Sequence, residues 1–166
     1  MNHPHPASHH AAKTTAKPHE HGLAFVPITL FAIVMGMGGM TLATEKAVHF
    51  FHWAINPTLF LQWLSAGLFV IFVGLYGYKA LRYPAQVKKD FRHPIRINFF
   101  PTISISLLLL SLAFKHTAPM VAVGLWGIGA ALHLLFSLAI ISVWMHYDKL
   151  QIMHLNPAWL IPAVGN

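Results

Sequence analysis

Four long apolar stretches, separated by short polar segments, dominate the pattern of side chains along this chain of 166 residues. Each stretch has about 17 to 25 residues, the length of a helix that crosses the roughly 30 Å hydrocarbon core of a bilayer. The pattern therefore predicts an all-α membrane protein. Its four complete transmembrane helices are expected at about residues 23–44, 57–81, 98–114 and 120–144.

The third stretch is the segment around which we expect the other helices to pack. It follows a basic loop that contains Arg92 and Arg96, and residues 103–114 carry no charge. An apolar run entered directly from basic residues is typical of a membrane helix that begins at the charged face of a bilayer. The polar side chains within residues 103–114 are Ser104, Ser106 and Ser111.

Composition supports a membrane protein. The chain is 56% hydrophobic and 9% charged, whereas soluble domains carry about 25% charged residues. It contains no cysteine, which excludes a disulfide framework and a thiolate metal site. With four acidic residues and no visible set of nucleophile, base and orienting group, the sequence does not indicate an enzyme. We expect no cofactor.

The positive charge is concentrated between the second and third apolar stretches. Residues 79–96 hold six of the eleven Lys and Arg residues against one acidic residue, Asp90. The positive-inside rule explains this cluster better than nucleic-acid binding does. The loop at residues 82–97 is therefore expected in the cytoplasm, together with the N-terminus and residues 148–156. The expected location is the inner or plasma membrane of the cell.

Glycines interrupt the first apolar stretch. Residues 35–40 read Met-Gly-Met-Gly-Gly-Met, and glycine weakens a helix but lets a neighbouring backbone approach closely in a membrane. Ala32 with Gly36, and Gly39 with Ala43, form pairs of small residues four apart. Helix packing through these pairs is the favoured interpretation, and a break that lines a pore is the alternative.

The first 22 residues form a polar tail that we expect to be disordered, because it has no apolar periodicity. It is not a signal peptide, since the apolar run begins only after residue 22. Adventitious metal binding is favoured over a metal site of fixed geometry. The histidines concerned are His3, His5, His9, His10, His19 and His21.

The last residues begin a fifth apolar segment at about residue 157, and the sequence stops at Asn166. About ten residues cannot span a bilayer. We therefore expect this chain to be an N-terminal fragment of a longer membrane protein, cut just inside its fifth span.

Three pieces of sequence resemble the tellurite-resistance/dicarboxylate transporter family, which includes TehA-like proteins, fungal sulfite and malate permeases and plant slow anion channels. They are the glycine-rich first stretch, the segment HPIRINFF at residues 93–100 and the segment NPAWLIPAVGN at residues 156–166. The resemblance covers residues 23–166. It implies ten transmembrane helices, arranged as five helical hairpins around a central pore, in a homotrimer.

The resemblance also implies that odd-numbered spans line the pore, so the first and third spans here would face it. The phenylalanine that plugs the family's pore lies on the ninth helix, so no residue here takes that role. In the third span, steps of four residues place Asn98, Thr102 and Ser106 on one stripe. Their polar groups could contact an anion; the alternative to this pore role is that they form hydrogen bonds within their own helix or to a neighbouring helix. The candidate pore-lining residues are Gly36, Gly39, Asn98, Thr102 and Ser106.

The leading functional prediction is a membrane channel or transporter for small anions. The family implies dicarboxylate, sulfite, tellurite or halide/nitrate as the anion, and the sequence does not choose among them. The expected partners are the anion, the lipid bilayer and two further copies in a trimer, with no nucleic acid. The alternatives are a small four-helix membrane scaffold and a b-type haem subunit. Haem is disfavoured because His133 and His146 do not share a helix face; His133 is expected to be a hydrogen-bonded packing residue.

Overall fold

A computed structural model describes residues 26–93, 95–146 and 160–161. Its elements, in order, are η2 (Ile28–Leu30), α1 (Phe31–Phe51), α2 (Thr58–Arg82), α3 (Pro84–Arg92), η3 (Arg96–Phe99), α4 (Pro101–Phe114) and α5 (Pro119–His146). Four segments are long and apolar enough to cross a membrane, which confirms the prediction of an all-helical chain with four such helices. They are Ile28–Phe51, Thr58–Arg82, Arg96–Phe114 and Pro119–Met145.

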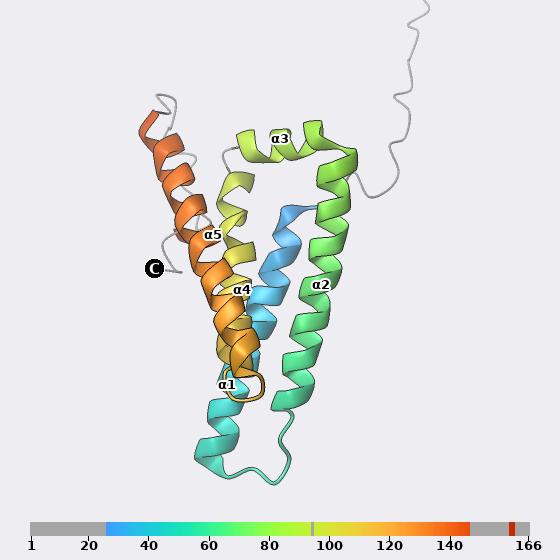
Figure 1. The fold of residues 1–166 in the computed structure, drawn as a ribbon, viewed down its shortest axis with the longest axis vertical. Helices are drawn as coiled ribbons and strands as arrows, with labels where there is room; N and C mark the ends of the chain where they lie inside the picture. Colours follow the sequence, from blue (N-terminus) through green and yellow to red (C-terminus); the bar gives the residue numbers. More distant parts are fainter. Residues whose placement is uncertain (1–25, 94, 147–159, 162–166) are drawn as a thin grey trace, which may run out of the picture.

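Helix α4 is the central element of this bundle. It packs against α5 on one side and α1 on the other, while α2 packs mainly on α1 (Figure 1). In the most apolar part of the α4 span 72% of the residues are buried, against 11 to 28% in the other three spans. This burial confirms that the third apolar stretch is the one around which the others pack.

The upper part of the bundle holds an aromatic core built around Phe31. Its ring lies edge-on to the rings of Phe69, Phe72 and Tyr76, with centroids 6.0 to 6.3 Å apart, an arrangement that aromatic quadrupoles favour. Because Phe31 belongs to α1 and the other three rings to α2, this core fixes how the first hairpin closes.

The first span differs from its prediction at its C-terminal end. The expected span ended at residue 44, but α1 continues to Phe51 and closes at His52, whose φ is 51°. Glu45 and Lys46 end the apolar run without ending the helix, because Glu and Lys are good helix formers. The helix therefore extends beyond its apolar part.

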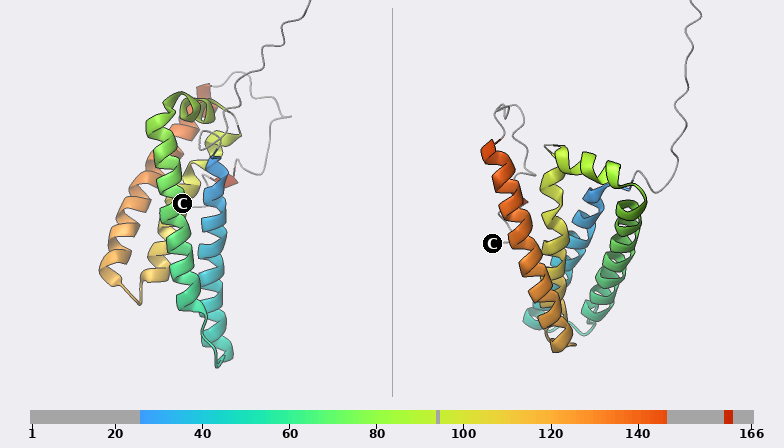
Figure 2. Two further views of the ribbon diagram at one scale, coloured as in Figure 1. Left: turned by 90° about the vertical axis from the view of Figure 1, so that its right-hand side faces the viewer. Right: turned by 45° about the horizontal axis from the view of Figure 1, so that its top comes forward.

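A further difference lies in the predicted loop at residues 82–97, which contains the helix α3. Pro84 occupies its first position, where a missing N–H is tolerated. Gln86, Val87 and Asp90 are partly or fully buried, whereas Lys88, Lys89 and Arg92 are exposed. Helix α3 thus lies across the end of the bundle with one face turned inward (Figure 2). A helix of nine residues with so few apolar side chains gives only a weak sequence signal.

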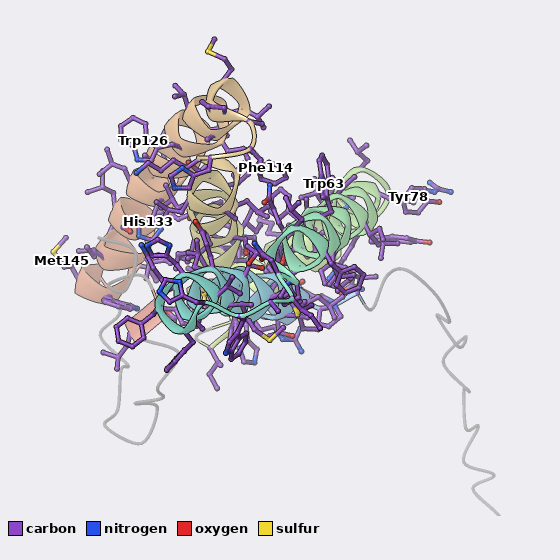
Figure 3. All side chains as sticks on the ribbon, turned by 90° about the horizontal axis from the view of Figure 1, so that it is seen from below. Trp63, Tyr78, Phe114, Trp126, His133 and Met145 are labelled. Carbon is purple, nitrogen blue, oxygen red and sulfur yellow. The ribbon has the colours of Figure 1, made fainter. Side chains whose placement is uncertain are left out.

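The outer surface of the bundle is apolar. Seen along the bundle, the labelled side chains of Tyr78, Trp126 and Met145 point away from the other helices (Figure 3), and they are 50 to 72% exposed. Trp63 is also exposed. Such a surface suits lipid or further apolar helices and does not suit water.

One glycine of the first span, Gly38, makes a close helix contact. A Cβ atom added there would lie 3.0 Å from Cβ of Leu109 on α4. Gly36 and Gly39, which the sequence suggested for packing, have no described atom within 4 Å of such a Cβ. Packing through Gly36 and Gly39 therefore stays a prediction, and within the described residues Gly38 makes the contact, because sequence spacing does not fix how a helix is rotated about its axis. Gly129 plays the corresponding role on α5, 3.0 Å from Cβ of Leu107.

Replacing Gly38 by Leu should destabilise the bundle by about 1–3 kcal/mol, because the added side chain must force α1 and α4 apart. Gly39→Leu is the matched control, since it adds the same side chain next to open space on the same helix. The melting temperature of the detergent-solubilised protein checks this. An equal loss in both variants would show that the contact with Leu109 does not set the spacing of α1 and α4.

Candidate functional site

The predicted stripe of Asn98, Thr102 and Ser106 is fully buried, each with 0% exposure. Thr102 Oγ1 donates to the carbonyl of Phe99 at 2.5 Å, and Ser106 Oγ donates to the carbonyl of Thr102 at 2.6 Å. Ser106 Oγ also lies 3.3 Å from the carbonyl of Phe31. Ser106 thus connects this buried polar stripe, called the polar seam below, to the start of α1, whereas the bond of Thr102 to Phe99 stays within its own turn.

The other serines of α4 face α5. Ser104 Oγ lies 3.0 Å from Nδ1 of His133, and Ser111 Oγ donates to the carbonyl of Ala122 at 2.8 Å. His133 is 3% exposed, and Figure 3 shows its ring turned toward the bundle interior. The prediction of a hydrogen-bonded packing histidine is confirmed.

The two candidate glycines lie elsewhere. Gly36 is exposed and Gly39 is half-buried, and a Cβ atom added at either position would have no described atom within 4 Å. The structure thus brings Asn98, Thr102 and Ser106 together in one seam and leaves the glycines on an open surface.

Two further polar contacts were not foreseen from the sequence, one between α2 and the turn after α4 and one between α1 and α2. Gln62 of α2, 1% exposed, donates from Nε2 to Oγ1 of Thr117 at 2.6 Å, and the hydroxyls of Thr41 and Ser65 lie 3.3 Å apart. Both contacts join residues that are far apart in the chain. The one available signal was the presence of polar residues inside apolar stretches, where each needs a partner.

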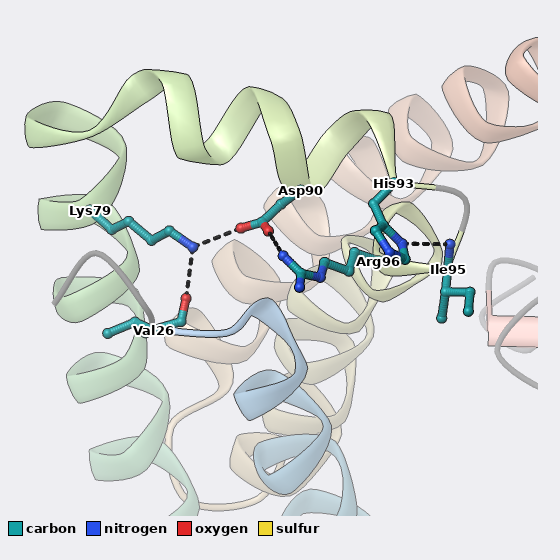
Figure 4. Close-up of polar contacts among 6 residues, drawn as sticks. All are labelled: Val26, Lys79, Asp90, His93, Ile95 and Arg96. Carbon is teal, nitrogen blue, oxygen red and sulfur yellow. Dashed lines mark hydrogen bonds and ion pairs between the residues drawn. The ribbon is translucent and has the colours of Figure 1, made fainter. Parts of the chain in front are cut away.

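An ion cluster beneath α3 is the most strongly charged feature of the described residues, and the sequence did not reveal it. Asp90 Oδ2 lies 2.7 Å from Nζ of Lys79, and Oδ1 lies 2.8 Å from Nη1 of Arg96 (Figure 4). Lys79 also donates to the carbonyl of Val26 at 2.8 Å. The side chains of Lys79 and Asp90 are 4% and 5% exposed, and that of Arg96 is 56% exposed. The cluster therefore ties together α2, α3, η3 and, through Lys79, the segment before η2.

His93 organises the turn that presents Arg96. Its Nδ1 lies 3.2 Å from the backbone N of Ile95 and 3.4 Å from that of Arg96, so the ring accepts from the first turn of η3 (Figure 4). A residue with a side-chain acceptor just before a helical turn commonly satisfies N–H groups that have no partner in that turn. Within the HPIR segment, His93 thus supplies the acceptor for these N–H groups, and Arg96 supplies a cation of the ion cluster.

Opposing effects act on the pKa of Asp90. Burial raises it, but the hydrogen bonds from Lys79 and Arg96 and the positive charges of these residues outweigh burial, so the pKa of the carboxyl lies below its ordinary value. Asp90 is therefore ionised at neutral pH.

Metal ligation has no support among residues 26–93, 95–146 and 160–161, where no three His, Asp or Glu side chains come together. The histidine tail lies outside the described residues. In the described spans, charged side chains occur only toward the helix ends, namely Glu45, Lys46, Lys79, Arg82 and Arg96. The middle of each span is uncharged.

Comparison with known proteins places this geometry in context. Residues 26–166 match the family model described as voltage-dependent anion channel. The chain is similar to an uncharacterized transporter of Methanocaldococcus jannaschii, with 27% identity over 81% of this chain and 40% of that protein. It is also similar to an S-type anion channel of Arabidopsis thaliana, with 31% identity over 84% of this chain and 28% of that one.

A third relative is the tellurite resistance protein TehA homolog of Haemophilus influenzae, with 25% identity over 84% of this chain and 43% of that protein. The chain thus spans less than half the length of these curated relatives.

Replacing Asp90 by Ala should cost about 3 kcal/mol of stability at neutral pH, because it leaves the buried Lys79 without its counter-ion. Since the pKa of Asp90 is lowered in the folded state, its contribution is complete above the ordinary value of about 3.9. It is lost as the pH falls through the folded-state pKa. Melting temperatures of the two proteins should therefore converge toward acid pH.

Lys88→Ala is the control for this experiment, because Lys88 is exposed on the same helix and should change the stability by less than about 0.5 kcal/mol. A loss in Asp90→Ala that does not depend on pH would contradict the ionic account.

Proposed function

The chain belongs to the voltage-dependent anion channel family, and from this membership we propose that the protein is an integral membrane channel or transporter for small anions. The observation that supports the proposal most is the uncharged middle of every described span. A pathway without fixed charge at its centre can pass an anion without holding it, which conduction requires. Tellurite resistance and S-type anion channel, the names of two relatives, are consistent with anionic cargo. The anion class remains that of the family: dicarboxylate, sulfite, tellurite or halide/nitrate.

For the architecture, we propose that these four helices are two hairpins of a ten-helix bundle; the predicted start of the fifth helix, at about residue 157, lies outside the described residues. The family resemblance is the basis, and the share of the relatives that the chain covers, about 40% for two of them, is in keeping with it. Within that bundle α1 and α4 would be inner helices, and three copies would form a homotrimer. Chemical cross-linking in native membranes tests the trimer.

For the pathway, we propose that the α1 face with Gly36 and Gly39 forms part of the pore wall. Its support is the open space beside both glycines, which no described helix fills. Asn98, Thr102 and Ser106 belong to the same proposal as a second layer, in the seam between the two inner helices. An anion would reach their hydroxyl and amide groups only when that seam opens, because all three are buried in this conformation.

Transport itself should be measurable with the full-length protein in liposomes. Current or flux is expected to follow the anion gradient, because the uncharged spans offer no site that selects a cation. A reversal potential at the equilibrium value for the cation would defeat the proposal. Residues 1–166 reconstituted alone, at the same protein-to-lipid ratio, should carry little, since only two of the five proposed inner helices are complete. Flux comparable with that of the full-length protein would defeat the ten-helix architecture.

Cysteine accessibility tests the wall, and residues 1–166 contain no cysteine to interfere. Gly36→Cys and Gly39→Cys should react with a small hydrophilic thiol reagent and lose most of their flux. Gly67→Cys is the matched control, because Gly67 is also exposed with open space around it but lies on α2, a proposed outer helix. Equal reaction at all three positions would contradict the wall.

The orientation that we propose places α3 and the N-terminus in the cytoplasm, supported by the basic residues near α3. The same reagent tests it at the exposed Ala85. In intact cells Ala85→Cys should stay unlabelled by a reagent that cannot cross the membrane. Labelling from outside would reverse the assignment.

A further inference from the structure

A cavity of about 340 Å³ lies beside the ion cluster, outside the uncharged middle of the spans. Four elements or their flanking residues enclose it: the start of the first span, α2, α3 and η3. Its volume is within the range of about 300–1,000 Å³ that small-molecule sites occupy. The lining residues are Pro27, Ile28, Thr29, Lys79, Gln86, Asp90 and Arg96.

The charge of this cavity is not balanced by its own residues. Lys79 and Arg96 bring two positive charges, and Asp90 brings one negative charge, so the wall keeps one excess positive charge. Lys79 is 3% exposed, and a charge so far from bulk water interacts strongly with an ion that enters beside it.

Lys79 and Arg96 also have N–H donors that their described hydrogen bonds do not use. Among the described contacts, Lys79 uses two of the three N–H bonds of its ammonium, on Asp90 and Val26. Arg96 uses Nη1 on Asp90, and the rest of its guanidinium fork has the geometry that binds two oxygens of one anion. The Gln86 amide and the Thr29 hydroxyl lie in the same wall. The one anionic group in the wall is Asp90.

We propose that this cavity binds a small oxyanion of phosphate type, held chiefly by Arg96 and Lys79. This site lies apart from the proposed pore wall, and the inference goes beyond anion passage and stands without it. Asp90 positions the two cations and does not contact the ligand favourably, since two anionic groups repel each other. The oxyanion has two chemical sources, namely free phosphate in solution and the phosphate of an anionic lipid headgroup.

The experiment uses the full-length protein in detergent and follows its melting temperature as inorganic phosphate is added, with chloride at matched ionic strength as the reference. Arg96→Gln should weaken phosphate binding by about tenfold or more, because it removes a charged, bidentate donor. Arg92→Gln is the matched control: it removes the same charge from an exposed residue that does not line the cavity. General salt stabilisation by phosphate affects both variants equally.

The variant Asp90→Asn distinguishes a phosphate-binding cavity from a purely structural ion cluster. This variant should melt at a lower temperature without phosphate, because the ion cluster loses its carboxylate. Its phosphate-induced shift should nevertheless be larger than that of the natural protein, because the repelling charge is gone. A purely structural cluster would lower the melting temperature without enlarging the shift.

A second arm separates the two sources. Nanodiscs of phosphatidylcholine alone are compared with nanodiscs that also contain phosphatidylglycerol. Free phosphate is the ligand if the shift appears in detergent, is lost in Arg96→Gln and persists in Arg92→Gln. The lipid headgroup is the ligand if only phosphatidylglycerol stabilises the natural protein and Arg96→Gln abolishes that effect. Equal responses of Arg96→Gln and Arg92→Gln, or no response to either ligand, would overturn the proposal, whether or not the protein carries anions.

Discussion

The hydroxyl groups of α4 must find hydrogen-bond acceptors inside the protein, because the hydrocarbon core of a bilayer offers none. Ser104 and Ser111 meet this requirement through α5, whereas Ser106 donates to Thr102 of its own helix and lies 3.3 Å from the carbonyl of Phe31 on α1. Each bond to a neighbouring helix works only at one rotation of α4. These polar contacts therefore help to set the positions of α1 and α5 around α4, together with the apolar side chains buried between the helices. The close approaches at Gly38 and Gly129 then fix the distances between these helices.

The ion cluster solves a different problem at the end of the bundle. Lys79 lies in the last turn of the long apolar helix α2 and is almost fully buried, which would be costly for an unpaired charge. Asp90 reaches it from α3, and the same carboxylate holds Arg96 just before α4. The short helix α3 therefore acts as a strap: it brings one acidic residue to two cations that belong to different spans. Without the carboxylate, α3 would lose its ionic contacts with the bundle, and Lys79 would be buried without a counter-ion.

The features that the sequence predicted are those set by local pattern. The length of the apolar runs predicted four helices able to span a membrane, and the uncharged residues 103–114 identified the central one. Steps of four predicted that Asn98, Thr102 and Ser106 share a face. The neighbour that this face meets could not be predicted, because helix rotation is a tertiary property. The same limit explains why Gly38, and not Gly36 or Gly39, makes the contact with α4. The sequence did not predict the pairing of Lys79 with Asp90, because charged residues in a basic loop are usually solvated at the surface.

Attraction of an anion and its passage through the membrane require different parts of the described structure, because a single site could not perform both. Attracting an anion requires positive charge, but a strong positive charge in the middle of a pathway would hold the anion and stop its movement. Here the basic residues of α3 and η3 lie at the end of the bundle, where water and salt limit their strength. The middle of the spans presents only uncharged side chains. Asp90 contributes to this division, because it lowers the net charge beneath α3 from two to one and keeps Lys79 and Arg96 at the end of the bundle. On the proposed function, an anion is attracted at this end and meets no fixed charge farther in.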